Sequence, residues 1–590
     1  MAPLPRIPWQ ATGNHWITIP CIQPGDASVH CVSALHAGLR GSIEFAGGDN
    51  FIDGESPPVF QIRIDHENKT RSLGEQGIAW ERESGWLPSF SCRIDDLAVR
   101  GLICAPHGSS ADIAGAVFEI SIENRGGHTA DINVSAVGAN VARMLRIRSA
   151  RPFDDPSLMI ERNRTIVASG AGAGNPGAIA FAAANPDAGI TCDADGWRIT
   201  EMVSIPSGES RSVAFFIAVA QEPDGAESIV RVMRRRGAPG LIETTRAALL
   251  SIEPATGNNA ADRLIARHMF FAYFCSVGRA VDDSHIYVVR SRIPWNSYGA
   301  TVRDWEALMW VMPALQLADP AFAREVLLRI CDLHGYAPGS GVHYLDGALF
   351  EPGFSLEGAA AYPVAVDEYI VQSGDDKIVE EPLLADALYS AFEDIESRRN
   401  KTFPLYATEI NADGTSPLHS YTLQANTIAA LALDVLSRTL DEKTAEKVQD
   451  PAAVRAAVLR QFVFTDAINK PVFTSSVDLN SPAAAHPSSP AAYWLPYFDL
   501  LDRDDSMYRR TVKPLESADT DLLLMWIGRL HGPDGARALD WLRRAALDGG
   551  LAAENVDESG RATANGGDAA LSGLLAFTAW YAVNALGVRI

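Results

Sequence analysis

Arginine, aspartate and aromatic side chains occur close together between residues 290 and 305. This stretch reads RSRIPWNSYGATVRDW and contains Trp295, Tyr298, Arg303 and Asp304. Aspartate accepts hydrogen bonds from vicinal hydroxyls, arginine donates to ring or hydroxyl oxygens, and aromatic faces stack on the C–H surfaces of sugars. The stretch is therefore a candidate binding site for a polyhydroxylated ligand. The alternative is that Asp304 only favours the dipole at a helix start.

Further polar and aromatic side chains lie in or beside the later loops. They are His343, Tyr344, Asp346, Glu409, Asp413, Tyr421, Gln424, Trp494 and Glu554. Asp413 stands in the turn sequence Asn-Ala-Asp-Gly, so a structural turn is the alternative to a chemical role. Glu409 stands in the run Tyr-Ala-Thr-Glu-Ile, and Glu554 follows two glycines and an apolar trio. Neither glutamate has the context of an ordinary turn residue, and both are candidates for chemistry.

The first 222 residues are typical of an antiparallel β-sandwich. Phe118, Ile120 and Ile122 alternate with polar residues, and a turn at 124–127 leads into a second alternating run at 131–135. A period of two indicates strands with one buried and one wet face. Many short runs of this kind, separated by Gly, Pro, Asn and Asp, favour two packed sheets. This part shows no catalytic constellation.

Residues 223–258 predict a helical linker, with three arginines at 234–236 before a Gly-Ala-Pro-Gly stop. Residues 259–590 then predict twelve helical segments, among them 260–281 and 490–501. The last of them, 568–587, is apolar on most sides, as a helix buried all round should be. Many even-numbered segments are more apolar than their predecessors. This alternation predicts two concentric rings of helices, an (α/α)6 barrel.

The loops that enter the even-numbered helices are long, and the opposite connections are short. The long loops are 282–302, 334–355, 398–419, 463–489 and 548–567. Long loops at one end of a rigid scaffold are where a binding site is expected. The candidate residues are therefore predicted to share one rim of the barrel.

The composition excludes several classes of function. A net charge of −23 argues against partners such as nucleic acid or an anionic membrane surface. The seven cysteines have no C-x-x-C spacing, which favours reduced thiols. The sequence shows no secretory signal and no apolar run of about 18 residues, so we expect a cytoplasmic protein. It also has no H-E-x-x-H, phosphate-loop or nucleophile-elbow motif, so we expect no metal and no cofactor.

In architecture the whole chain resembles the glucoamylase-type clan of (α/α)6 glycoside hydrolases with an N-terminal β-sandwich. The segment from Tyr298 to Asp304 resembles the clan's aromatic-Gly…Arg-Asp segment, which binds the sugar in the cleaved subsite. Glu409 lies in the loop where the clan keeps its general acid. Glu554 resembles the clan's Leu-x-x-Glu general base, and residues 571–576 with Trp580 are similar to its final inner helix.

The resemblance implies an inverting glycoside hydrolase, and the first three long loops, which are long enough to close a pocket, favour exo action on an oligosaccharide. Inversion needs one carboxyl that protonates the leaving oxygen and, about 6.5–9.5 Å away, a second that activates water. We assign the acid to Glu409 and the base to Glu554. The local sequence around Glu409 departs from the clan's pattern, so Asp413 is an alternative acid, and Asp367, beside Glu368, is a third candidate. Arg303 and Asp304 are expected to hold the sugar, and the remaining candidates to line its pocket.

Other classes of function remain open on the same scaffold. An inverting phosphorylase would use phosphate in place of the basic carboxylate, and Glu554 argues against it. A polysaccharide lyase would use a Tyr/His base and usually has the opposite domain order. A carbohydrate-binding protein would bind the sugar without turning it over. A carbohydrate is the expected partner in every case, and a homo-oligomer is compatible with the sequence.

Overall fold

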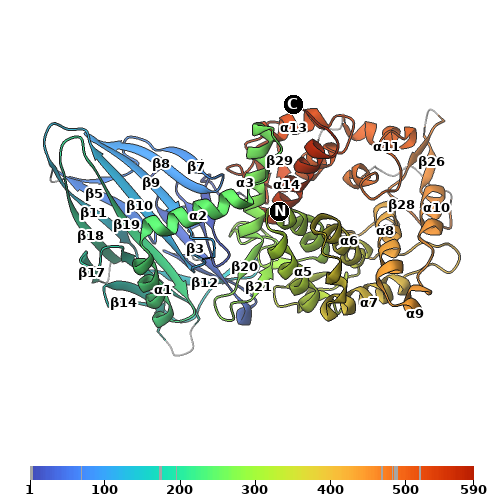
Figure 1. The fold of residues 1–590 in the computed structure, drawn as a ribbon, viewed down its shortest axis with the longest axis horizontal. Helices are drawn as coiled ribbons and strands as arrows, with labels where there is room; N and C mark the ends of the chain where they lie inside the picture. Colours follow the sequence, from blue (N-terminus) through green and yellow to red (C-terminus); the bar gives the residue numbers. More distant parts are fainter. Residues whose placement is uncertain are drawn as a thin grey trace. The chain divides into compact units, whose positions relative to one another are not determined.

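The computed structural model describes residues 4–589 except 68, 110, 172–175, 194–195, 467–468, 482, 484–488 and 517–519. The chain divides into two compact units (Figure 1). The first comprises residues 1–253 together with 277–286 and 291–300, and the second comprises 254–276, 287–290 and 301–590. The chain therefore returns twice to the first unit after it has begun the second.

Antiparallel strands make up most of the first unit. They form a six-stranded, an eight-stranded and a five-stranded sheet. In spatial order, the six-stranded sheet contains β1 (Gln10–Gly13), β2 (Ile17–Ile22), β3 (Val29–His36), β4 (Gly41–Ala46), β12 (Ala142–Arg146) and β13 (Ala150–Pro152). The eight-stranded sheet contains β14 (Ser157–Arg162), β15 (Thr165–Gly170), β16 (Ala178–Ala183), β19 (Ser210–Ala220), β10 (Gly115–Asn124), β9 (Leu97–Cys104), β8 (Leu87–Ile94) and β7 (Ala79–Glu83). The five-stranded sheet contains β17 (Gly189–Asp193), β18 (Gly196–Ile205), β11 (Ala130–Gly138), β5 (Gln61–His66) and β6 (Lys69–Ser72).

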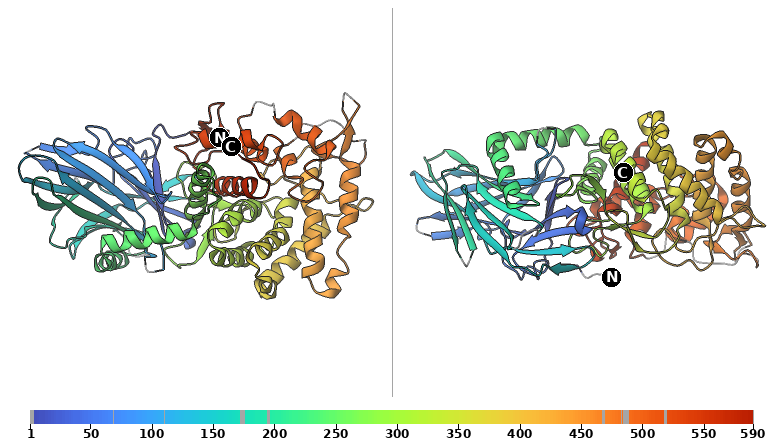
Figure 2. Two further views of the ribbon diagram at one scale, coloured as in Figure 1. Left: turned by 45° about the horizontal axis from the view of Figure 1, so that its top comes forward. Right: turned by 90° about the horizontal axis from the view of Figure 1, so that it is seen from below.

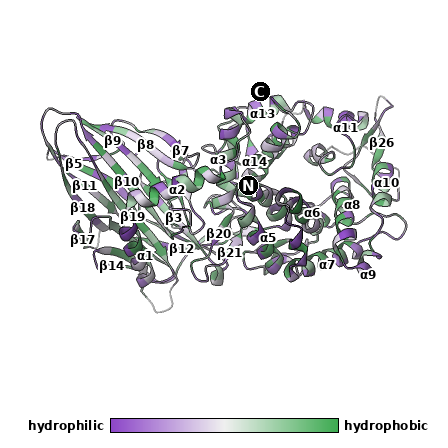
Figure 3. Ribbon diagram, in the orientation of Figure 1, coloured by the Kyte–Doolittle hydropathy of each residue, from purple (hydrophilic) through white to green (hydrophobic). Residues whose placement is uncertain are grey.

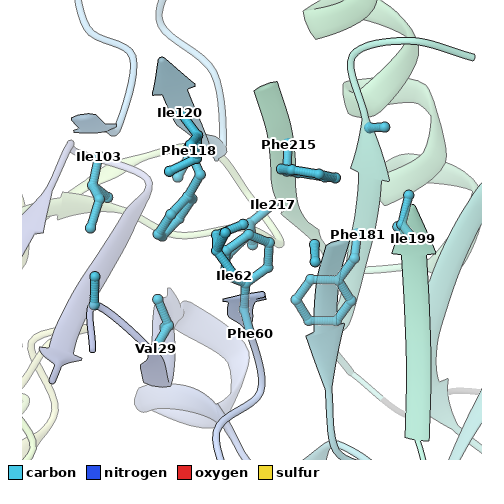
Figure 4. Close-up of a cluster of buried hydrophobic side chains, with 14 of the residues drawn as sticks. Val29, Phe60, Ile62, Ile103, Phe118, Ile120, Phe181, Ile199, Phe215 and Ile217 are labelled. Carbon is cyan, nitrogen blue, oxygen red and sulfur yellow. The ribbon is translucent and has the colours of Figure 1, made fainter. Parts of the chain in front are cut away.

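An aromatic core joins the eight-stranded and five-stranded sheets (Figure 4). Phe118 of β10 stands opposite Phe215 of β19, as the alternation of apolar and polar residues along β10 requires. Phe181 of β16 stacks on Trp197 of β18 with ring centroids 4.4 Å apart. Side chains from facing sheets thus interdigitate in one core, which is how two antiparallel sheets bury their apolar faces.

Two long helices follow the sheets. Helix α1 (Pro223–Arg236) and helix α2 (Ala238–Ile252) belong to the first unit. Helix α1 packs on β15, β16 and β19, and α2 packs on β10. The stretch predicted as a linker therefore covers part of the eight-stranded sheet (Figure 1).

The second unit consists mainly of helices, and short strands of two or three residues occur in the loops between them. The helices are α3 (Asn259–Cys275), the π-helix η2 (Glu306–Val311), α4 (Met312–Ala318), α5 (Pro320–His334), α6 (Leu356–Ser373), the 3-10 helix η3 (Asp376–Glu380), α7 (Pro382–Ser397), α8 (Leu423–Thr439), α9 (Glu442–Ala445), α10 (Pro451–Gln461), the 3-10 helix η4 (Pro490–Trp494), α11 (Ser506–Glu516), α12 (Leu523–Arg529), α13 (Gly535–Arg544) and α14 (Ala569–Asn584). Figure 2 shows α14, in red, beside α3, against which it packs. Among the described residues, no helix combines the length and apolar character needed to cross a bilayer.

Buried and amphipathic helices alternate along this unit. Helix α7 buries only one stripe, at spacings of three and four residues, and its other side exposes polar residues together with Leu383 and Tyr389. Hydrophilic and hydrophobic residues are mixed along the helix (Figure 3). Helices α6, α8 and α14 are instead buried over most of their length. Caps fix where these helices begin: Ser355 accepts from the Gly358 N–H, and Asp568 accepts from the Leu571 N–H.

Two predicted helices differ from the observed elements. The helix predicted over 490–501 is only the 3-10 helix Pro490–Trp494, followed by turns. The helix predicted over 260–281 ends at Cys275. In both cases apolar residues continue beyond the helix because the turn or strand that follows is itself buried. A buried turn or strand shows the same run of apolar residues as the end of a buried helix, so sequence periodicity cannot distinguish them.

Candidate active site

The second unit contains a cavity of about 330 Å³ that is partly open to solvent. Aromatic side chains form much of its wall, and carboxyl groups face into it, as in a site for a polyhydroxylated ligand. Its aromatic lining includes Trp305, Trp310, Trp494, Tyr497, Phe498 and Phe577, and its acidic lining consists of Glu357, Glu368 and Asp413. Three predicted site residues line it, namely Asp413, Gln424 and Trp494.

Glu357 is a buried carboxyl group in the first turn of α6. The Ser355 hydroxyl donates to its Oε2 at 3.3 Å. Burial, reinforced by the negative charge of Asp413, raises the pKa of Glu357 to about 7. A carboxyl group that keeps its proton near neutral pH can serve as a general acid.

Asp413 faces the same cavity from the turn at 411–415. Its Oδ1 accepts from the Thr415 N–H at 2.9 Å and from the Thr415 hydroxyl at 2.6 Å, so Asp413 is also a structural turn residue. The Arg303 guanidinium lies against this turn, because a Cβ added to Gly414 would be 2.3 Å from Arg303 Nη2. The structure thus brings together two predicted site residues from distant parts of the chain.

Glu368 lies eleven residues after Glu357 on α6, which is about three turns or 16 Å along the helix axis and nearly the same helix face. The Tyr497 hydroxyl donates to Glu368 Oε1 at 2.6 Å. The second oxygen, Oε2, is buried without a hydrogen-bond partner among the described residues. Its neighbour Asp367, the third predicted acid, instead pairs with Arg438 at 2.8 Å and does not line the cavity.

We expect Glu368→Gln to stabilise the protein at alkaline pH. Burial raises the pKa of Glu368 from 4.5 to about 7. Since the folded state then binds more protons than the unfolded state, stability falls as pH rises from about 4.5 to 7. The glutamine variant lacks this penalty, so it should gain up to about 3 kcal/mol at pH 8 and little at pH 4. Urea unfolding at both pH values measures the difference.

The exposed Glu393 of α7 supplies the matched control for this prediction. The Glu393→Gln variant should unfold with nearly the same midpoint as the parent protein at pH 8. Equal stabilisation by both substitutions would contradict the buried-carboxyl explanation, since it would reflect only the loss of one negative charge.

A buried network of four charges lies beside the cavity wall. Arg290 pairs with Glu306 and also with Asp568, at 2.5 Å, and Arg303 pairs with Glu306 at 3.0 Å. Burial alone would raise the pKa of Glu306, but the two guanidinium groups hold it below its ordinary value. The Arg290 guanidinium also lies 4.6 Å from the ring centroid of the cavity residue Trp310. The network therefore fixes the π-helix η2 and the start of α14 around the cavity.

Glu409 and Tyr421 lie outside the main cavity, in a second and more open hollow that shares Pro417 and Leu418 with it. The side chain of Glu409 is 55% exposed and accepts from Arg398 at 2.6 Å. This hydrogen bond lowers the pKa of Glu409, which is the opposite of what a general acid requires.

Glu554 lies next to the cavity wall without lining it. Its backbone carbonyl accepts from the Leu523 N–H, and the two neighbours of Leu523, Leu522 and Leu524, both line the cavity. Its carboxylate accepts from the Asn565 side chain at 2.7 Å. The predicted base is thus held at a defined position in the loop before α14.

The remaining predicted residues do not line the cavity. Asp304, His343, Tyr344 and Asp346 lie around the small sheet formed by β22 (Thr301–Val302), β23 (Val342–Tyr344) and β24 (Leu349–Glu351). Asp304 and His343 are buried, and Asp346 accepts from the Ala348 N–H in a turn. Trp295 and Tyr298 belong to the segment 291–300, which is part of the first compact unit.

Comparisons with known proteins identify the fold. No protein-family model matches the chain, and no curated protein matches it significantly in sequence. In structure it is similar to a bacterial glucoamylase complexed with acarbose, with a TM-score of 0.59 and 10% identity over 100% of this chain and 96% of that one. It is also similar to a protein assigned as a kojibiose phosphorylase, from the human microbiome, with a TM-score of 0.60 and 10% identity over 97% of this chain and 86% of that one. The chain therefore has the fold of the glucoamylase-type (α/α)6-barrel glycoside hydrolase clan.

Proposed function

We propose that this protein is a glycoside hydrolase in which an N-terminal β-sandwich precedes an (α/α)6 barrel. The observation that carries the proposal is the cavity in the second unit, whose wall combines Glu357 and Asp413 with aromatic side chains. Aromatic faces bind the C–H surfaces of a sugar, and carboxyl groups supply acid–base chemistry. The clan whose fold the chain shares acts on glycosides, which supports the same substrate class.

We assign the general acid to Glu357, supported by Asp413. With a pKa of about 7, Glu357 keeps its proton over much of the neutral range and can give it to the leaving glycosidic oxygen. Asp413, as a nearby anion, helps to keep that proton on Glu357. This assignment replaces Glu409, whose lowered pKa and exposed position do not suit an acid.

We retain Glu554 as the general base that activates water. It lies beside the cavity wall, and a carboxylate at this place leaves no need for phosphate as the nucleophile. A base on the opposite side of the scissile bond from Glu357 gives inversion at the anomeric carbon. The limited volume of the cavity and the carboxyl of Glu368 further along α6 favour exo action on a chain end.

The proposal is tested by incubating the protein with α- and β-linked oligosaccharides, with and without phosphate, and following the products by anomer-resolved proton NMR. We expect phosphate-independent release of a sugar with inverted anomeric configuration. Turnover only with phosphate would make the protein a phosphorylase, and retained configuration would require Glu554 to act as a nucleophile. Tight sugar binding without turnover of any substrate would leave a carbohydrate-binding protein.

A further inference from the structure

Asp304, His334 and His343 form a buried cluster separate from the cavity. One oxygen of Asp304 and one ring nitrogen of each histidine all lie within 4.8 Å of one another. The three residues are 4%, 1% and 1% exposed. They come from the start of the helix that continues as η2, from the last residue of α5 and from β23. None of them lines the cavity, so its chemistry does not explain why they are together.

The hydrogen bonds of His343 leave a nitrogen lone pair directed into the cluster. Its Nδ1 lies 3.1 Å from the Gly347 carbonyl oxygen, which can only accept, so Nδ1 carries the proton. Its Nε2 then presents a lone pair, and Asp304 Oδ1 lies 4.0 Å from it. Nε2 is buried and has no hydrogen-bond partner among the described residues. Two acceptor atoms thus lie 4.0 Å apart with no hydrogen bond between them in the described part of the chain.

The surroundings of His334 and Asp304 also suit metal ligands. His334 Nδ1 is also buried without a hydrogen-bond partner in the described part of the chain. Asp304 is held from behind, because the Gly339 N–H donates to Oδ2 at 2.7 Å and the Tyr362 hydroxyl donates to Oδ1 at 3.1 Å. A carboxylate fixed by outer hydrogen bonds, and an imidazole that donates its second N–H to a backbone carbonyl, are the surroundings that metal ligands have in proteins.

We propose that Asp304, His334 and His343 bind one divalent transition-metal ion of the Zn²⁺ type. Two imidazole nitrogens and one carboxylate oxygen are a donor set that suits Zn²⁺ and other late first-row metals. Ligand atoms around a tetrahedral zinc lie about 3.3 Å apart, so each side chain needs to move by only about 1 Å to close around the ion. The ion would tie β23 to the end of α5 and to the helix start that also carries Arg303.

Zinc titration by calorimetry, after chelation of the purified protein, tests the site without reference to activity. We expect one equivalent of Zn²⁺ to bind and to raise the melting temperature, and Co²⁺ to bind with visible absorption bands that report its ligands. His343→Ala should weaken binding by about 100-fold or more, since loss of a ligand exceeds the effect of losing an outer hydrogen bond. His285→Ala is the matched control, because His285 is exposed and lies outside the cluster.

Tyr362→Phe keeps the proposal testable if His343→Ala fails to fold. It removes only the hydroxyl that donates to Asp304 and should weaken zinc binding by about 10-fold to 100-fold in a folded protein. Absence of stoichiometric Zn²⁺ or Co²⁺ binding by the folded parent protein would overturn the proposal, and so would equal binding by the parent and His343→Ala. These results are independent of glycoside turnover, so the metal site and the proposed function can fail separately.

Discussion

Replacing Glu357 with glutamine is expected to lower kcat for natural oligosaccharides by about 10²-fold to 10⁴-fold, the usual contribution of a general acid. Glutamine keeps the shape of the side chain and can still accept from Ser355, but it has no proton to give. Since protonated Glu357 is the active form, kcat in the parent protein should fall as pH rises through about 7. Steady-state kinetics between pH 5 and pH 9 measure both effects.

The leaving group separates an acid from a merely structural residue. An aryl glycoside with a strongly acidic phenol leaves without protonation, so Glu357→Gln should recover most of its activity on that substrate. Glu393→Gln, an exposed substitution of the same kind, should behave as the parent protein on both substrates. A variant that is equally inactive on both substrates would exclude Glu357 as the acid.

Breaking the buried charge network should have the largest effect on stability. Arg290→Met leaves Asp568 and Glu306 buried with one guanidinium fewer, and removing one partner of a buried pair costs about 3–5 kcal/mol. Asp568 also caps α14, so the start of that helix should loosen. Urea unfolding followed by tryptophan fluorescence measures the loss.

Two further variants test whether that loss of stability comes from an unbalanced buried charge. Arg235→Met removes an exposed arginine and should change stability by no more than about 0.5 kcal/mol. A double variant that combines Arg290→Met with Asp568→Asn leaves only the balanced pair Arg303–Glu306 and should recover part of the stability. If Arg290→Met alone unfolds at the same urea concentration as the parent, the network does not stabilise the unit.

Much of the architecture could be predicted because it rests on periodicity. Alternation along residues 118–122 predicts the strand that the structure contains as β10, and apolar residues on all sides of 568–587 predict the buried helix α14. These features depend on local spacing, which a single sequence displays. Of the five long loops, 398–419 and 463–489 contribute described residues to the cavity wall, and the other three do not.

Local spacing could not predict which acidic residue of the site has the raised pKa of a general acid. Glu357 follows a Ser cap in a first helical turn, where an acidic residue is ordinary, and only its burial by the surrounding chain raises its pKa. Glu409 stands instead in a loop outside any helix, where Arg398 reaches it and lowers its pKa. From the sequence alone, His334 looks like any other buried residue of a helix. Long-range packing decides these properties.

The return of residues 277–286 and 291–300 to the first unit limits how modular the protein can be. Within that unit Arg292 donates to the carbonyl of Asn14 at 2.9 Å and to that of Trp16 at 2.8 Å. A fragment that starts at residue 254 would keep this arginine and lose both acceptors, leaving buried polar groups unsatisfied. The helical half is therefore not an independent folding unit. An exchange of N-terminal halves between relatives would have to include these two short segments.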